Sequence, residues 1–336
     1  MKKLLQGQAV KAIVLLLLSV FYFNRSNAQD WITVGNTGIV DTTATDISFV
    51  LGPDGTPYLA YNDVMNYNKI SVIKYVNNSW QPIDSALNIN ANPVLAVDHN
   101  GILYLACSYT DYAHTTQIMK YEGTTWVNIT GSLHLIDQNK QPLAIDNNNN
   151  LYTAYKNDSN KVSVVEYDGN NWVAVGDSNF SNTVNSPLSL AIDNNNEVYV
   201  AYNNYSVGNR AYVMKYDGNN WGIVGGQLDK IDVPDVPMAI DNNGTPYIVY
   251  SIVDSTGIDG LGIMMKYDGT NWVKVGGESF AAPTIGYCAI AIDGNGNPYV
   301  AYRDMTNNSK IIIREYNGSS WVTLGNPHIY KTWYPC

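Results

Sequence analysis

Cysteine, arginine and histidine are scarce in this 336-residue chain, and each shortage excludes a class of structure or site. Three cysteines are too few for a disulfide framework, so the fold must depend on an apolar core. Beyond residue 28 the only arginines are Arg210, Arg303 and Arg314. That is too few for an enzyme that holds a substrate carboxylate with a cluster of arginines. The four histidines show no metal-ligand spacing, and we expect no metal and no other cofactor.

Long apolar runs are absent except for one, at residues 12–23. Three lysines precede this run, and Ser26 and Ala28 place small residues where signal peptidase cleaves. A membrane-spanning helix needs about twenty apolar residues, so the run is too short to cross a bilayer. We therefore predict that residues 1–28 are a cleaved signal peptide, with a retained anchor as the alternative. The mature protein would be secreted, periplasmic or at the cell surface, with no membrane insertion.

Positive charge is in short supply as well. The leader carries four basic residues and no acidic one, so its removal takes the formal net charge from −10 to −14. An acidic surface repels phosphate backbones and anionic lipid headgroups. The charge therefore argues against a nucleic-acid partner and against binding to anionic membranes.

Tryptophan, in contrast, recurs at a regular interval along the whole chain. Seven tryptophans are separated by 49, 46, 46, 49, 51 and 49 residues: Trp31, Trp80, Trp126, Trp172, Trp221, Trp272 and Trp321. A fixed period of this length is typical of propeller arrays. We predict an all-β fold, a six-bladed β-propeller of four-stranded antiparallel blades over residues 29–326, followed by a tail at 327–336.

Each repeat contains four short runs with strand composition, which we call A, B, C and D. In the fourth repeat they read LAID at 190–193, VYVAY at 198–202, YVMKY at 212–216 and WGIVG at 221–225. These runs are rich in Val, Ile, Tyr and Trp, and Asn, Asp and Gly separate them. No segment keeps a helical period, so we expect essentially no helix in the mature chain.

The A–B and C–D junctions are short and rich in Asn, Asp and Gly, residues that tolerate the positive φ of tight hairpins. Stretches such as 146–150 lack the closing acid of a calcium loop, and we interpret them as turns. Strand D occurs seven times but the ring has room for six. Either copy 31–35 or copy 321–325 is therefore surplus. Our hypothesis is that the N-terminal copy pairs with the last blade and so staples the ring, with the C-terminal copy as the alternative closing strand.

The passage from strand C to strand D resembles two propeller families. Its Tyr-Asp…Trp pattern, as at 216–221, is similar to the kelch repeat and to the galactose-oxidase propeller, although the Gly-Gly doublet of that repeat is absent. The Asp-Gly-x-x-Trp turn resembles the Asp-box of sialidase-type propellers, without the residue between Asp and Gly. Size and blade number are similar to the six-bladed fucose-binding lectins. That resemblance implies sugar sites with an Arg and a Glu between blades, and five glutamates and three arginines cannot supply this pair in most clefts.

No catalytic constellation is visible, and we predict a non-enzymatic propeller that binds or scaffolds a protein or a glycan. The alternative is a carbohydrate-active enzyme, of the glycoside hydrolase or oxidase type, with an unrecognised site. The B–C and D–A connections vary between repeats, and rigid scaffolds usually carry binding residues on such loops. Rings and charges that the repeat does not require predict a ligand-binding set on this face: Tyr109, Asp111, Tyr112, Tyr205, Arg210, Arg303 and Asp304.

Overall fold

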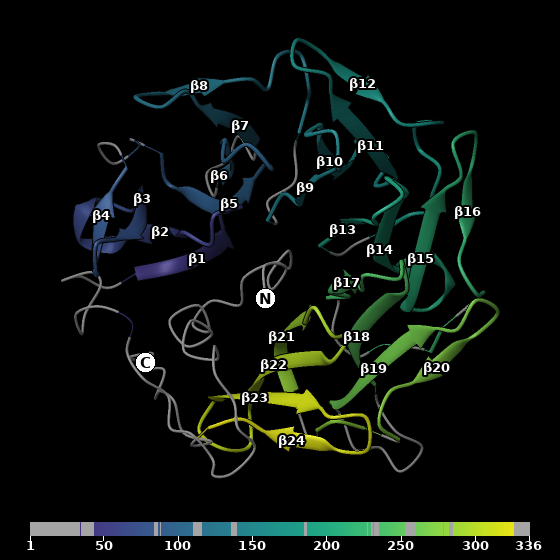
Figure 1. Cartoon of the computed structure of the whole chain (residues 1–336). Coiled ribbons are helices and arrows are strands. Elements are labelled where there is room, and N and C mark those ends of the chain that lie inside the picture. The colour runs from purple at the N-terminus through teal and green to yellow at the C-terminus, as the bar shows by residue number, and fades with distance from the viewer. Residues whose placement is uncertain are drawn as a thin grey trace.

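The structure is a ring of six β-sheets. The computed structural model describes residues 34, 44–83, 87, 89–109, 116–135, 140–184, 187–226, 228–229, 231, 235–252, 260–277, 279–281 and 285–325. Within these residues every sheet has four antiparallel strands in simple meander order, and the sheets follow one another around a centre (Figure 1). The predicted six-bladed propeller is confirmed.

The strands of each blade, A to D in chain order, have the following bounds. Blade 1 has β1 (Ala44–Leu51), β2 (Pro57–Asp63), β3 (Lys69–Val76) and β4 (Ser79–Pro82). Blade 2 has β5 (Ala91–Val97), β6 (Leu103–Tyr109), β7 (Thr116–Tyr121) and β8 (Trp126–Asn128). Blade 3 has β9 (Leu143–Ile145), β10 (Leu151–Lys156), β11 (Val162–Tyr167) and β12 (Trp172–Ala174).

The second half of the ring repeats this pattern. Blade 4 has β13 (Ser189–Ile192), β14 (Val198–Asn204), β15 (Arg210–Tyr216) and β16 (Trp221–Ile223). Blade 5 has β17 (Met238–Ile240), β18 (Pro246–Ile252), β19 (Leu261–Tyr267) and β20 (Trp272–Lys274). Blade 6 has β21 (Ile285–Ile292), β22 (Pro298–Asp304), β23 (Lys310–Tyr316) and β24 (Trp321–Thr323).

Helical structure in the described part of the chain consists of two single 3-10 turns, η2 (Val64–Asn66) and η3 (Tyr205–Val207). Both lie between strands B and C of their blades. None of the described helices is long and apolar enough to cross a membrane. The expectation of almost no helix is confirmed.

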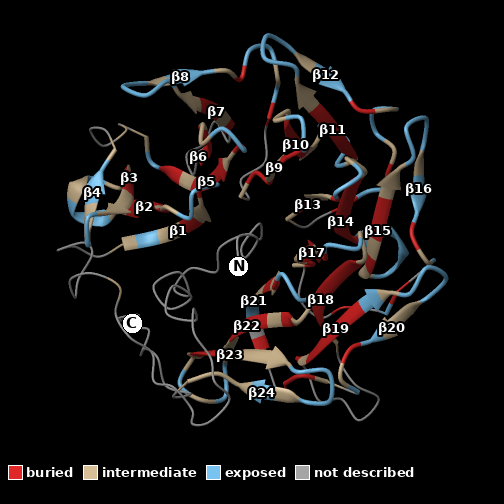
Figure 2. Ribbon diagram, in the orientation of Figure 1, coloured by how far each residue is buried: buried red, intermediate tan, exposed pale blue. Residues whose placement is uncertain are grey.

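The apolar core lies between neighbouring blades (Figure 2). Successive side chains of a strand point to opposite faces of its sheet. On β14, Val200 and Tyr202 therefore pack against blade 3, whereas Tyr199 and Ala201 pack against blade 5. Each blade supplies both faces in this way, which explains why its inner strands are apolar on both sides. A single blade could not bury its faces alone.

The two end blades also bury the faces that do not meet a neighbour in sequence. Phe49 and Leu59 of blade 1 are each 4 % exposed, and Ile313 of blade 6 is 1 % exposed. Strand alternation places Ile313 opposite the face that packs on blade 5. Neither end of the array therefore leaves an apolar face open to water.

The repeated tryptophan joins consecutive blades along their outer strands. Trp221 Nε1 donates to the Val175 carbonyl of the preceding blade at 2.8 Å, and Trp172 donates to the Ile129 carbonyl at 2.7 Å. The acceptor always lies three residues after the preceding tryptophan. The remaining bonds of this series are Trp80 to Val34, Trp272 to Val224 and Trp321 to Val275. This contact explains the tryptophan that recurs at about fifty-residue spacing, and the apolar residue three positions later, such as Val175, Val224 or Val275, is buried.

The structure shows which of the two terminal copies of strand D belongs to blade 6. The outer strand of blade 6 is β24, the C-terminal copy, which pairs with β23 through Tyr316 and Trp321. The expectation that the N-terminal copy takes this position was therefore wrong. Of the N-terminal copy only Val34 belongs to the described residues, and its carbonyl accepts the Trp80 indole at 3.3 Å. Val34 thus occupies, next to blade 1, the place that a preceding blade's D strand holds elsewhere.

Candidate binding face

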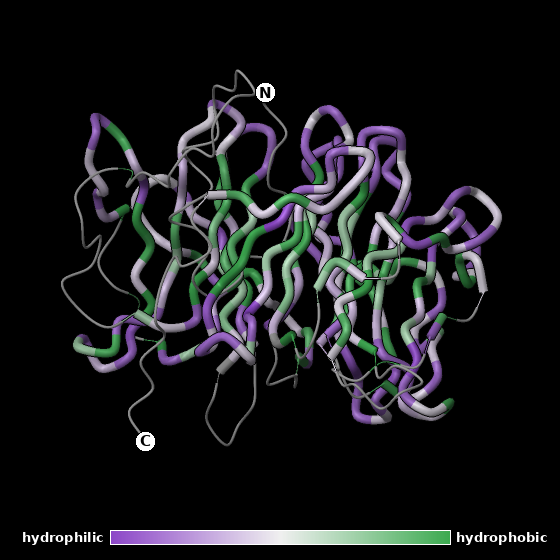
Figure 3. Tube along the Cα trace, turned by 90° about the horizontal axis from the view of Figure 1, so that it is seen from below, coloured by the Kyte–Doolittle hydropathy of each residue, from purple (hydrophilic) through white to green (hydrophobic). Residues whose placement is uncertain are grey.

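Meander blades divide the connections between the two faces of the ring. We call the face with the A–B and C–D turns the turn face, and the face with the B–C and D–A connections the loop face. Seen from the side, apolar residues follow the strands and polar residues gather at both edges (Figure 3). The two edges therefore look alike in hydropathy, and only their hydrogen bonds and exposed side chains distinguish them.

On the turn face, acidic side chains are engaged by their own turns. Asp241 Oδ1 accepts the backbone amides of Asn243 at 2.8 Å and Thr245 at 2.9 Å. The equivalent acids of four other blades bind their turns in the same way: Asp98, Asp146, Asp193 and Asp293. These carboxylates are therefore engaged within their own hairpins.

In blades 3 and 6 a second carboxylate lies near the strand B tyrosine, and in blade 4 Glu197 lies beside Asp193. The Tyr152 hydroxyl lies 3.4 Å from Asp146 Oδ2, and Glu166 on the neighbouring strand lies close to the same hydroxyl. Burial first, and then the Glu166 carboxylate, raise the pKa of Tyr152. The phenol therefore stays protonated and can donate a hydrogen bond, but it cannot act as a base near neutral pH. Tyr299 of blade 6 repeats the arrangement with Glu315.

The predicted ligand-binding residues all belong to B–C connections, on blades 2, 4 and 6. Tyr109 ends β6, Tyr205 opens η3, and Arg210 is the first residue of β15. Arg303 and Asp304 are adjacent at the end of β22. Asp111 and Tyr112, and the side chain of Tyr109, lie outside the described residues. The described members are thus spread over separate blades of the loop face.

Three B–C connections share one conformation, which the sequence reading treated as variable. Residues 63–69, 204–210 and 304–310 have equal length, and each ends in two consecutive residues with positive φ before a basic residue opens strand C. The positive-φ pairs are Tyr67 with Asn68, Gly208 with Asn209, and Asn308 with Ser309. Asn and Gly accept this conformation readily, so the shared shape has a signal in the sequence.

Local hydrogen bonds explain two of the predicted residues without a ligand. Asp304 Oδ1 accepts the amides of Thr306 at 3.0 Å and Asn307 at 3.2 Å, so it closes its own loop. Arg210 Nη1 donates to the Leu228 carbonyl at 3.0 Å, which ties a B–C connection to a D–A connection. Tyr205, in contrast, is 59 % exposed. It is the predicted residue whose described environment fits a ligand contact best.

Large exposed apolar side chains are distributed unequally between the two faces. Within the described chain, seven of them lie in B–C connections or at the start of β21: Val64, Met65, Tyr67, Tyr205, Val207, Tyr287 and Met305. The other four lie on outer strands: Val127, Val173, Ile223 and Val322. None lies in a described turn of the turn face. The sequence analysis did not single out four of these residues: Met65, Tyr67, Met305 and Tyr287. A signal was present in the three equivalent loops, because the first residue after Asp63, Asn204 or Asp304 is apolar or aromatic in each.

The described residues contain no group of three or more His, Cys, Asp or Glu side chains placed to hold a metal ion. Arg314 donates from Nη1 to the Phe280 carbonyl, which gives it a structural role. The arrangement on the loop face is suited to stacking on rings and to hydrogen bonding of neutral polar groups.

Comparison with known proteins defines the class of protein through its fold. No protein-family profile and no characterised protein sequence matches the chain. Among solved structures, the fucose-specific lectin from Aleuria aurantia matches with TM-score 0.57 and 13 % identity, over 87 % of this chain and 98 % of the lectin. AofleA from Arthrobotrys oligospora matches with TM-score 0.55 and 9 % identity, over 83 % and 86 %.

An enzyme shares the same fold. An ulvan lyase, a polysaccharide lyase, matches with TM-score 0.56 and 11 % identity, over 81 % of each chain. These structural matches, at such low identity, show a common propeller fold and nothing about activity, since one fold hosts many functions.

Proposed function

We propose that this chain is an exported, non-enzymatic propeller that binds glycans through its loop face. The observation that carries the proposal is the unequal distribution of exposed rings and apolar side chains, which gather on the loop face and avoid the turns of the turn face. Sugars present apolar C–H faces that pack on aromatic rings, and hydroxyls that bind polar side chains. The lectins with this fold support a saccharide over a protein as the ligand class.

A glycan array with the mature chain, residues 29–336, tests this function. Tyr287→Gly removes an exposed ring of the loop face and should weaken binding about tenfold, which corresponds to about 1.4 kcal/mol. Asn195→Ala, an exposed position in an A–B turn, is the matched control and should bind as the wild type does. Failure of the wild type to bind any glycan, with capture of a protein from the native envelope fraction, would replace glycan by protein as the ligand.

The non-enzymatic part has its own test, because a polysaccharide lyase shares the fold. Incubation of the mature chain with neutral and uronic-acid polysaccharides should produce no new reducing ends and no unsaturated products. Turnover of any of them would make the protein an enzyme. Export is tested by intact mass of the protein from its native host, which should start at Gln29; residues 1–28 still attached would refute cleavage.

A further inference from the structure

The inner strands of the two end blades each contain a β-bulge. In β21, Gly286 pairs with Arg303 and Cys288 pairs with Tyr302, which leaves Tyr287 as the extra residue. β1 shows the same irregularity between Thr45 and Ser48. Bulges re-aim a side chain and are frequent beside functional sites. In blade 2, β5 and β6 pair in register at this level, and in blades 3 to 5 strand A begins only after it.

Both bulges hold a non-glycine residue in the left-handed region, with φ of +52° at Asp46 and +43° at Tyr287. Aspartate tolerates this conformation, but for a bulky aromatic residue it is a strained outlier. Such strain persists only where the surrounding structure imposes it, and it gathers at functional sites. Tyr287 is also 61 % exposed, so apolar burial does not compensate for its conformation.

Asp46 and Tyr287 occupy the same position of the repeat. Each stands six residues before the first residue of the A–B turn, which is Gly52 in blade 1 and Asp293 in blade 6. The same count in every blade defines a set that we call the axis ring: Asp46, Asn92, Lys140, Pro187, Asp235 and Tyr287. Strand A is the innermost strand, so these residues surround the axis on the loop face. Five of the six repeats keep Asp at the turn, whereas the axis-ring position holds five different residue types in the six blades.

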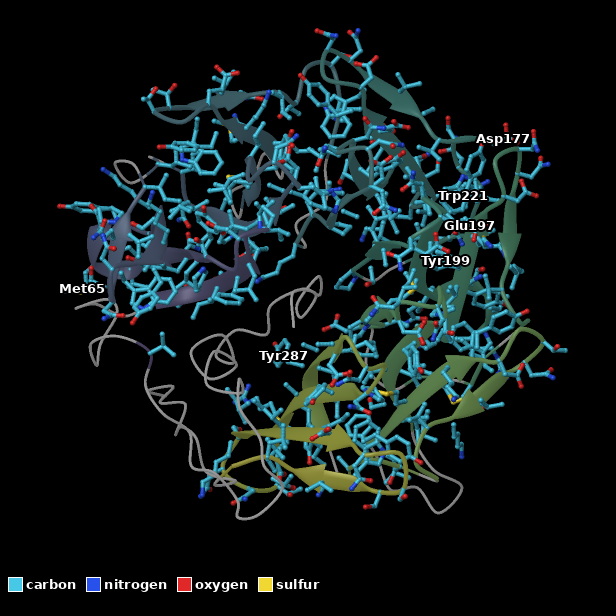
Figure 4. All side chains as sticks on the ribbon, viewed as in Figure 1. Met65, Asp177, Glu197, Tyr199, Trp221 and Tyr287 are labelled. Atoms are coloured by element: carbon cyan, nitrogen blue, oxygen red, sulfur yellow. The ribbon has the colours of Figure 1, made fainter. Side chains whose placement is uncertain are left out.

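Contacts between blades bring two members of the axis ring, Lys140 and Asp235, close to the bulges of the end blades. Lys140 Nζ donates to the Ile47 carbonyl at 3.0 Å, so blade 3 reaches past blade 2 to the bulge of blade 1. Burial first, and then the nearby Asp235 carboxylate, raise the pKa of Cys288, the residue after Tyr287. The Tyr287 side chain lies on the axis side of blade 6, near the centre of the ring, whereas Met65 lies at the outer rim (Figure 4).

We propose that the axis ring is a single saccharide site, in which the Tyr287 ring packs against the apolar face of a neutral sugar residue. For the hydroxyl groups of the sugar, Asp46 and Asp235 provide carboxylates and Asn92 provides an amide. Lys140 adds an ammonium donor. Two carboxylates against one ammonium, on a mature chain of net charge −14, disfavour an anionic sugar. This inference rests on the proposed glycan-binding function and assigns its site.

Each chain has one axis ring but three equivalent B–C connections, so the number of ligands bound per chain distinguishes the two locations. The three equivalent B–C connections would bind up to three ligands per chain, whereas the axis ring binds one. Isothermal titration of the mature chain with methyl glycosides of fucose, galactose, mannose and glucose, and with glucuronic acid, should give one site for a neutral sugar. A stoichiometry of two or more would overturn the axis ring as the site.

Tyr287→Gly is the decisive variant, because it removes the ring and also relieves the positive φ. Its melting temperature should equal or exceed that of the wild type, while affinity falls by at least about tenfold. Asp46→Asn keeps the tolerated φ and should lower affinity severalfold. Ile223→Ala is the matched control, since it removes an exposed apolar side chain of an outer strand, away from the axis ring and the B–C connections, and it should leave this single-site affinity unchanged.

The outcomes separate this site from the function on which it rests. Wild-type protein that binds none of these sugars, and nothing on a glycan array, refutes both. Wild-type binding that Tyr287→Gly leaves intact refutes the axis ring alone. Binding that Tyr205→Ala abolishes and Tyr287→Gly spares moves the site to the B–C loops.

Discussion

The two faces of the ring are built from the same repeat but use their polar residues in different ways. On the turn face, each A–B turn also binds the next: Asn147 Nδ2 donates to the Asn194 carbonyl at 2.8 Å, and Asn194 Nδ2 donates to the Asn242 carbonyl at 2.9 Å. Asn242 continues the series to Gly294 at 3.1 Å. On the loop face the connections instead hold exposed rings. An Asn-rich surface is therefore not automatically a binding surface, because its amides can be consumed by the scaffold.

The series of turn-to-turn bonds has no side chain to continue it where the array ends. Gly294 of blade 6 lacks an amide side chain, and blade 1 has Gly52 and Pro53 where the other blades have Asp and a following polar or glycine residue. The two end blades are thus atypical on both faces, since they also carry the bulges at Asp46 and Tyr287. Terminal repeats of an array commonly depart from the consensus.

The largest expected effect comes from two glycines that lie toward opposite faces. Gly225 follows strand D with φ of +67°, and a Cβ there would lie 2.7 Å from Trp272 Cδ1. Gly218 in a C–D turn has φ of +95° but open space around it. Gly225→Ala should cost about 3 kcal/mol, from backbone strain plus steric overlap, and Gly218→Ala about 1 kcal/mol from strain alone. Urea denaturation measures both, and equal losses would mean that packing on Trp272 does not constrain Gly225.

The architecture was predictable because the same sequence pattern recurs in every repeat. The tryptophan spacing follows from the indole-to-carbonyl bonds between blades, and the Gly of the A–B turns, such as Gly244 at φ +79°, was expected from hairpin geometry. Which copy of strand D takes which place in the ring was less predictable. That copy 321–325 rather than copy 31–35 forms the outer strand of blade 6 depends on which segment reaches β23, and the two copies read almost alike.

The candidate site was predicted only as a face. Tyr205 was found because an exposed ring stands out in a loop, whereas Asp304 was chosen for its charge and serves as a local cap. Tyr287 was missed because a bulge adds only one residue to a strand, and the sequence of this strand otherwise looks regular. Aligning the six repeats backward from the A–B turn would have revealed that its position varies. Periodicity therefore predicts the scaffold, and the exposed Tyr287 lies where its strand departs from the regular pattern.

A middle-sized effect compares one aspartate from each face. Asp241→Ala removes two backbone hydrogen bonds at a buried carboxylate and should lower the free energy of unfolding by about 2 kcal/mol, without changing glycan affinity. Asp304→Ala removes a more exposed cap and should cost about 0.5–1 kcal/mol. Asn at either position keeps an acceptor oxygen and is the conservative control. Thermal denaturation and titration together decide the case: an Asp304→Ala that loses affinity while Asp304→Asn keeps it would restore Asp304 as a ligand contact.

The smallest expected effect is acid sensitivity on the turn face. Backbone hydrogen bonds from Asn171 and then Asn170 lower the pKa of Asp168, and the C–D turns of blades 4 and 5 repeat this at Asp217 and Asp268. A carboxyl group whose pKa is lower in the folded state stabilises the fold above its unfolded pKa of about 3.9. That stabilisation is lost as the pH falls from there through the folded pKa. Stability should therefore decline between about pH 4 and pH 2.

The triple variant Asp168→Asn, Asp217→Asn, Asp268→Asn keeps the acceptor oxygens but removes the titrating groups. Its melting temperature at pH 7 should lie slightly below that of the wild type, because an amide accepts a weaker hydrogen bond than a carboxylate. Below pH 4 the two curves should converge, since the wild-type carboxylates become protonated there while the amides do not titrate. Circular dichroism melting from pH 7 to pH 2 measures the difference. Curves that stay parallel throughout would show that these turns contribute nothing to the acid response, and that it arises elsewhere in the ring.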